Sequence, residues 1–127
     1  MPTVFIEGKY AGEYIASEAN GELSRDVAML IQQAAVVPAG TVLGIITASG
    51  KVTPVSLAAG DGSQTAAKIL YSNVDATAGD KLVTVTSRET EVNGAEITYP
   101  AGATPAQILA INAQLAASAI IVRAGSV

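Results

Sequence analysis

Short apolar runs separated by turns that contain glycine or proline make up most of the chain. Residues 41–47 are apolar on both faces of an extended segment, which predicts a buried strand. The chain turns near Gly50, and residues 52–55 return as a second strand. Pro54 cannot donate to a sheet, so this strand ends there or lies at an edge. Further strands are expected near residues 68–71, over residues 81–86 with Val83 and Val85 on one face, and over residues 119–122.

Two other segments carry mixed signals. Within residues 26–31, Val27, Met29 and Ile31 alternate along the chain as in a strand, yet Ser24 just before them is a suitable helix cap. Periodicity alone leaves both structures open. Asn93 and Gly94 form the dipeptide that favours a type I′ turn, which predicts a tight hairpin at that point.

One helix is predicted from local chemistry. Thr104 is a suitable N-cap, Pro105 occupies the first helical position, and Gln107 completes a capping box. The fold class expected is therefore mainly β: a small domain of short strands with one or two short helices. Residues 25–127 are expected to form this domain, and residues 1–24 an extended N-terminal arm.

Composition narrows the possible functions. The 127 residues are half apolar but only 14% charged, and a weakly charged surface of this kind predicts burial against partners. The net charge of −4, with no two basic residues adjacent, argues against nucleic-acid binding. No apolar stretch approaches the ~20 residues of a membrane span, and no basic leader precedes the first apolar residues. We expect no membrane association and no signal peptide.

The residues usual in catalysis are scarce. Histidine and cysteine are absent, which removes the commonest general base, the thiol nucleophile and most transition-metal ligands. Residues 60–68, GDGSQTAAK, resemble a phosphate-binding loop in composition, but they match neither the Walker spacing nor the dinucleotide fingerprint. A surface turn at Asp61 and Gly62 is the favoured interpretation. We expect no catalytic residues, no metal ion, no cofactor and no small-molecule substrate.

The first residues have the composition of a binding segment. Residues 3–7 form a short β-prone stretch with little behind it, and the following residues are rich in glycine, alanine and serine. Tyr10 and Tyr14 lie in this region, where tyrosines serve either as anchors for a partner or as packing against the domain. Both interpretations stay open from the sequence.

Several motifs, in a fixed order over residues 25–123, resemble the head decoration proteins of tailed phages, the lambda protein D type. They are AGTVLG at 39–44, GKVTP at 50–54, DGS at 61–63, AA at 66–67 followed by IL at 69–70, VDATAGD at 74–80, RETEVN at 88–93 and IIV at 120–122. Each motif is weak alone, and their shared order carries the resemblance. Residues 1–24 are similar only in kind.

The resemblance implies a β-clip-like domain that forms homotrimers. Such trimers bind the outer surface of the expanded head at three-fold and quasi-three-fold positions and cement the major capsid protein. The protein would lie in the host cytoplasm during assembly and on the virion afterwards. The resemblance also favours a strand over residues 27–31 and implies that the arm pairs with a coat-protein strand. The predicted capsid contacts are Thr3, Val4, Phe5, Ile6, Glu7, Tyr10 and Tyr14.

Alternatives remain. The arm is more β-prone than is usual in such relatives, so it pairs either with the coat or with a neighbouring decoration subunit. A different class of function, a carbohydrate-binding or adhesin module on the virion surface, would need a concave site lined by aromatic residues. A trimeric β-clip hydrolase acting on nucleotides is the third possibility and lacks a motif.

Overall fold

The computed structural model describes residue 12, residues 14–18 and residues 24–123. The elements along the chain are the following: β1 (Ile15–Glu18), β2 (Arg25–Leu30), β3 (Val42–Ile45), β4 (Val52–Pro54), β5 (Ala66–Leu70), β6 (Lys81–Thr86), β7 (Thr90–Asn93), α1 (Pro105–Ala116) and β8 (Ile120–Arg123). The prediction of a mainly-β domain is confirmed, and α1 is the one helix in the described part of the chain. No helix among these residues is long and apolar enough to cross a membrane.

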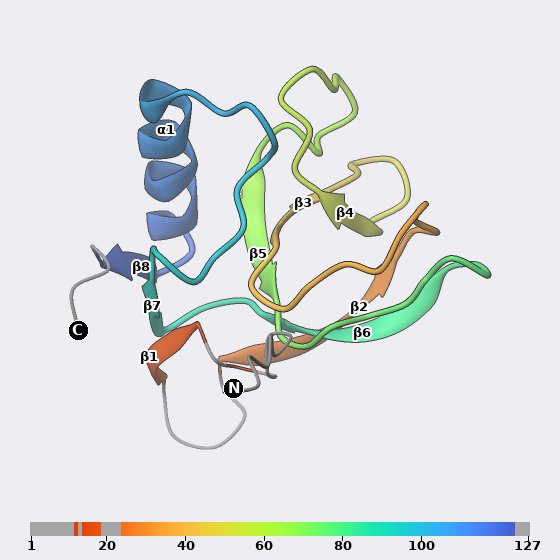
Figure 1. Cartoon of the computed structure of the whole chain (residues 1–127), viewed down its shortest axis with the longest axis horizontal. Helices are drawn as coiled ribbons and strands as arrows, with labels where there is room; N and C mark the ends of the chain where they lie inside the picture. The colour runs from red at the N-terminus through yellow and green to blue at the C-terminus, as the bar shows by residue number, and fades with distance from the viewer. Residues whose placement is uncertain (1–11, 13, 19–23, 124–127) are drawn as a thin grey trace, which may run out of the picture.

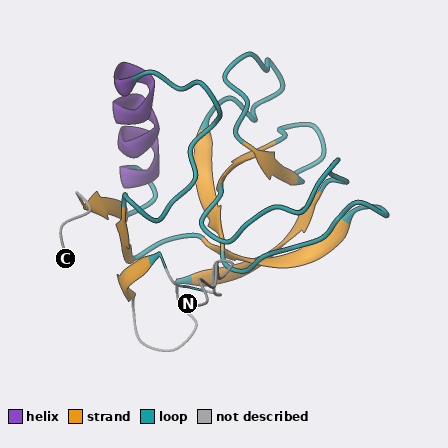
Figure 2. Ribbon diagram, in the orientation of Figure 1, coloured by secondary structure: helices purple, strands orange, loops and turns teal. Residues whose placement is uncertain are grey.

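Five strands close into a small barrel in the order β2-β4-β3-β5-β6, with β6 pairing back to β2. The remaining strands form a three-stranded sheet, β1-β7-β8, at one side of the barrel beside α1 (Figure 1). Figure 2 shows that the helix stands along one flank of the barrel and leaves the long curved strands β2 and β6 at the other side. Among the described helices and strands, α1 and the three-stranded sheet thus cover one flank of the barrel, and none covers the flank formed by β2 and β6.

Two apolar cores follow from this arrangement. One lies inside the barrel and includes Leu30, Leu43 and Leu70, all fully buried. The other lies between the outside of the barrel, the three-stranded sheet and α1. β3 contributes to both, because Val42 belongs to the outer core and Leu43 to the inner one. The predicted burial of this strand on both faces is therefore confirmed.

The segment with the ambiguous pattern is a strand. β2 pairs antiparallel with β6 over its whole length, from Arg25 opposite Thr86 to Leu30 opposite Lys81. β4 ends at Pro54, as expected for a residue without an amide hydrogen. The helix begins as predicted: the Thr104 side chain accepts from the Gln107 amide, and the Gln107 side chain accepts from the Thr104 amide.

The predicted hairpin at Asn93 and Gly94 is wrong. Neither residue has the positive φ that a type I′ turn requires. Instead the Asn93 side chain accepts from the Ala95 amide at 3.0 Å, and the Glu96 amide donates to the Asn93 carbonyl at 3.0 Å. The chain then leaves the sheet, passes through α1 and returns as β8, parallel to β7. A parallel partner needs such a crossover, so no hairpin forms.

Part of the range expected to be an arm is packed on the domain. β1, at residues 15–18, pairs antiparallel with β7 at the edge of the three-stranded sheet. The Asn93 amide also donates to the Tyr14 carbonyl at 2.8 Å. Composition did not predict this strand, because its formation depends on pairing with β7, a segment far along the chain.

Candidate interaction surfaces

The loop at residues 60–68 is a structural turn. Asp61 Oδ1 accepts from the Ser63 amide at 3.0 Å and from the Ser63 hydroxyl at 2.6 Å, and these bonds lower the pKa of Asp61. Gly62 has a φ of +106°, and a Cβ there would lie 2.7 Å from the carbonyl oxygen of Ile45. The carboxylate is thus used to hold the turn, and the glycine allows the loop to pass close to β3.

Lys68 points away from that loop. Its Nζ donates to Ser87 Oγ at 2.9 Å and lies 3.9 Å from Asp26 Oδ2. Asp26 also pairs with Arg88, and the hydrogen bond from Arg88 is the main cause of the lowered pKa of Asp26. The lysine therefore belongs to an ion-pair cluster at one end of the barrel, and the nine-residue loop forms no phosphate cradle.

Several carboxylates in the described residues serve local structure. Asp75 Oδ1 accepts from the Thr77 amide and hydroxyl, and Glu91 pairs with Arg123 across β7 and β8. No group of three or more histidine, cysteine, aspartate or glutamate side chains that could hold a metal ion occurs in this part of the chain.

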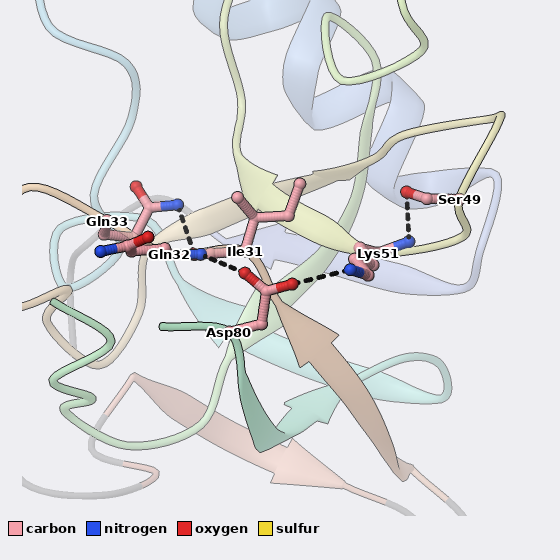
Figure 3. A network of polar contacts seen from close by, with 6 residues as sticks. All are labelled: Ile31, Gln32, Gln33, Ser49, Lys51 and Asp80. Carbon is pink, nitrogen blue, oxygen red and sulfur yellow. Dashed lines mark hydrogen bonds and ion pairs between the residues drawn. The ribbon is translucent and has the colours of Figure 1, made fainter. Parts of the chain in front are cut away.

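A polar cluster joins three separate segments at the other end of the barrel (Figure 3). The Asp80 carboxylate accepts from Lys51 Nζ at 2.7 Å and from the Gln32 amide at 2.9 Å. The bond from Lys51 is the main cause of the lowered pKa of Asp80, followed by the bond from Gln32. The cluster links the segment after β2, the β3–β4 turn and the residue before β6, so it fixes these loops relative to one another.

An open groove of about 680 Å³ lies between three loops. Its lining comes from residues 33–38, 41–42, 54–58 and 98–101, and none of these residues is charged. Val36 and Leu57 on its walls are exposed by 55% and 38%. Tyr99 is the aromatic residue of the lining, and its hydroxyl donates to Asn112 Oδ1 at 2.6 Å. The groove has the character of a protein contact more than that of a polar ligand site.

A second apolar surface lies on the outside of β2 and β6. We call it the outer face and define it by Val27, Met29, Leu82 and Thr84, which the register pairs as Val27 with Thr84 and Met29 with Leu82. Val27 and Leu82 are exposed by 67% and 64%. Large apolar side chains paired on an exposed sheet face mark an interaction surface.

Of the predicted capsid contacts, Thr3, Val4, Phe5, Ile6, Glu7 and Tyr10 lie outside the described residues. Tyr14 lies within them and is fully buried in the outer core, where its hydroxyl is hydrogen-bonded to Thr86 Oγ1. The structure thus places Tyr14 in the packing role, because its ring fills space between the barrel and the three-stranded sheet.

The other described tyrosines are also engaged. Arg25 lies over the Tyr71 ring at 4.3 Å, and Tyr99 is bound to Asn112 in the groove. Together with the buried Tyr14, they do not line a common concave site. Sequence reasoning missed the outer face, although its signal was present. Consecutive residues of a strand point to opposite faces, so Val27 lies on the face opposite to Ala28, and Leu82 lies on the face opposite to Val83 and Val85.

These features are typical of a protein that works through contacts with other proteins. Its barrel carries a groove without charged residues and an exposed apolar face.

A family model described as bacteriophage lambda head decoration protein D matches residues 4–120, and the chain belongs to this family. The resemblance in the sequence is thereby confirmed. The protein is a capsid decoration protein that associates with the phage head, and its family is a structural one. A search of curated proteins found no match.

Proposed function

We propose that the protein binds as a homotrimer to the outer surface of the expanded phage head, at three-fold and quasi-three-fold positions, and stabilises the shell. The observation that carries this proposal is the family match, which spans the domain and begins at Val4, within the arm. A cement function needs an attachment segment as well as a rigid body, and the match includes parts of both.

The arm is the proposed attachment to the major capsid protein. Residues 3–7 contain the β-prone triplet Val4, Phe5 and Ile6. An extended apolar segment of this kind suits addition to the edge of a partner's sheet, where main-chain hydrogen bonds provide affinity and alternate side chains provide specificity. Tyr10 would contact the same partner, while Tyr14 holds the base of the arm in the domain's core.

Trimerisation would turn a weak contact into a strong one. Three arms on one rigid trimer bind at high effective concentration once the first has bound, which raises the overall affinity by roughly 10²–10⁴-fold. A closed ring of three also needs two different contact surfaces on each copy. The described residues carry exposed apolar side chains in different places, among them Val36 and Leu57 in loops and Leu109 on α1.

The charge distribution supports a position on the outside of the shell, away from the packaged DNA. Among the residues that the structure describes, four basic side chains pair with carboxylates, namely Lys51, Lys68, Arg88 and Arg123. With a net charge of −4, the chain lacks the clustered positive charge that phosphate contacts need.

Deletion of residues 1–7 tests the attachment. The shortened protein should keep its fold and its trimer mass by sedimentation equilibrium, because it retains the buried residues of both cores that the structure describes, from Tyr14 to Ile120. It should bind expanded heads roughly 10²-fold or more weakly in a pelleting assay, since all three arms are lost. A full-length variant with Val4, Phe5 and Ile6 changed to serine separates loss of apolar contact from loss of length.

Expanded and unexpanded shells provide the second arm of this experiment. The intact protein should bind expanded shells preferentially and raise the temperature at which they rupture. Undiminished binding by both arm variants would refute the attachment, and equal uptake on the two shell forms would refute the cement function. A monomeric mass on and off the shell would refute the trimer.

A further inference from the structure

The outer face continues a surface that the protein covers elsewhere. Partners across antiparallel strands point to the same side of a sheet. On this side of the barrel, Thr86 has Arg25 as its partner on β2 and Ile69 as its partner on β5. The next row along β6 is Thr84 with Val27, and the row after that is Leu82 with Met29. The three rows form one continuous surface with an apolar end.

The first row is covered by the N-terminal part of the chain. Tyr14 is fully buried and its hydroxyl is hydrogen-bonded to Thr86 Oγ1. Thr86 is fully buried too, although Val27 on the second row is 67% exposed. The cover therefore ends between the first row and the second.

Gly12 brings the chain to the second row. The Tyr71 amide donates to the Thr84 carbonyl at 3.1 Å, so Tyr71 extends this row on the β5 side. The Gly12 amide donates to the Tyr71 carbonyl at 2.8 Å, and a Cβ on Gly12 would lie 3.0 Å from the Tyr71 ring. Residue 12 consequently lies against the ring of Tyr71, beside the uncovered rows.

The segment before Gly12 is long enough to reach the exposed end. Five residues separate Ile6 from Gly12, and an extended chain advances about 3.3 Å per residue, which gives a reach of roughly 20 Å. Leu82 is two residues from Thr84 along β6, or about 7 Å. The segment's apolar residues are Val4, Phe5 and Ile6, and Phe5 is the chain's single phenylalanine.

We propose that, in the free protein, residues 4–6 pack on the outer face of the same copy, against Val27, Met29 and Leu82. The apolar triplet and the apolar face cover each other until the triplet is taken up elsewhere. This intramolecular contact concerns the protein off the capsid and does not depend on how it binds a head. In a protein with only 14% charged residues, it also limits the apolar surface shown to other copies.

Disulfide trapping tests the contact, because the natural chain contains no cysteine. Under mild oxidation at low micromolar concentration, the variant with Ile6→Cys and Leu82→Cys should form an intramolecular disulfide, seen by intact mass as a loss of two hydrogens. The control pairs Ile6→Cys with Leu109→Cys, on α1, where the side chain is 70% exposed and lies on another flank of the domain (Figure 1). The control should remain largely in the thiol form.

A tryptophan provides an independent readout, since the chain has none. Leu82→Trp should emit at shorter wavelength in the full chain than in the same variant without residues 1–7. Equal emission from both, together with equal cross-linking of the test and control pairs, would overturn the proposal. Predominantly intermolecular disulfides would also overturn it, because they would assign the triplet to a neighbouring copy.

Discussion

The two faces of the β2–β6 pair differ although they belong to the same strands. On the inner face, Leu30 and Val85 are fully buried in the barrel core. On the outer face, Val27 and Leu82 are more than 60% exposed. Both faces are apolar, so the difference does not come from side-chain type. The inner face stabilises the fold, whereas the outer face leaves large apolar side chains exposed in the described part of the chain.

Truncation of one leucine on each face should give the largest contrast. Leu30→Ala removes a fully buried side chain from the barrel and should lower the free energy of unfolding by about 2–5 kcal/mol. Leu82→Ala, at 64% exposure, should change it by less than about 0.5 kcal/mol. Urea denaturation at one fixed protein concentration measures both. Similar losses would show that the outer face is part of the stabilising core.

The next largest change in the free energy of unfolding is expected at the covered row beside the outer face, where Tyr14 contacts Thr86. Tyr14→Phe removes the hydroxyl partner of buried Thr86 and should cost about 1–3 kcal/mol. Thr86→Val alone leaves the Tyr14 hydroxyl without this partner and should cost a similar amount. The double variant should lose less than the sum, because both polar groups are gone. Strict additivity in the denaturation cycle would mean that the two hydroxyls do not interact.

Removal of the N-cap of α1, the helix on the barrel's other flank, should lower stability by a smaller amount. Thr104→Ala removes the N-cap and half of the capping box, and should cost about 1 kcal/mol. Thr104→Ser keeps the hydroxyl and serves as the matched control. Thermal unfolding followed by circular dichroism would compare them. Equal stability of the alanine and serine variants would show that the cap does not contribute.

The smallest effect is expected at the polar cluster beside the exposed end of the outer face. Because the pKa of Asp80 is lowered below its ordinary 3.8, its charged form stabilises the folded state above that pH, and this stabilisation is lost as the pH falls through the folded-state pKa. Asp80→Asn should therefore melt slightly below the natural protein at pH 7 and match it more closely near pH 2. A difference that grows on acidification would have the wrong sign.

Local sequence features predicted the elements that depend on neighbouring residues. The capping box at Thr104 and Gln107 and the turn at Asp61 and Gly62 form as expected, because their hydrogen bonds join residues two or three positions apart. The prediction failed at Asn93, where the pairing of β7 with β8 replaces a hairpin. That pairing joins segments on either side of α1, and no local pattern indicates it.

The candidate surfaces were less predictable than the fold. The arm was predicted from its β-prone triplet, which lies outside the described residues and stays a prediction. The outer face was not predicted, since its residues have the pattern of ordinary strand positions. Tyr14 illustrates the same limit: its sequence context fits an anchor for a partner or packing on the domain. The hydrogen bond between its hydroxyl and Thr86, 72 residues away, shows that Tyr14 packs on the domain.

The sequence by itself determined the family, the mainly-β class, the helix and the absence of histidine and cysteine, because these depend on residue identity and short-range order. Only the tertiary structure decided which apolar residues remain exposed. Barrel closure through β2 and β6 places alternate residues of these strands inside and outside, and α1 and β1 lie on another flank. Exposure is a property of the assembled surfaces, so Val27 and Leu30 can lie on one strand and serve different purposes.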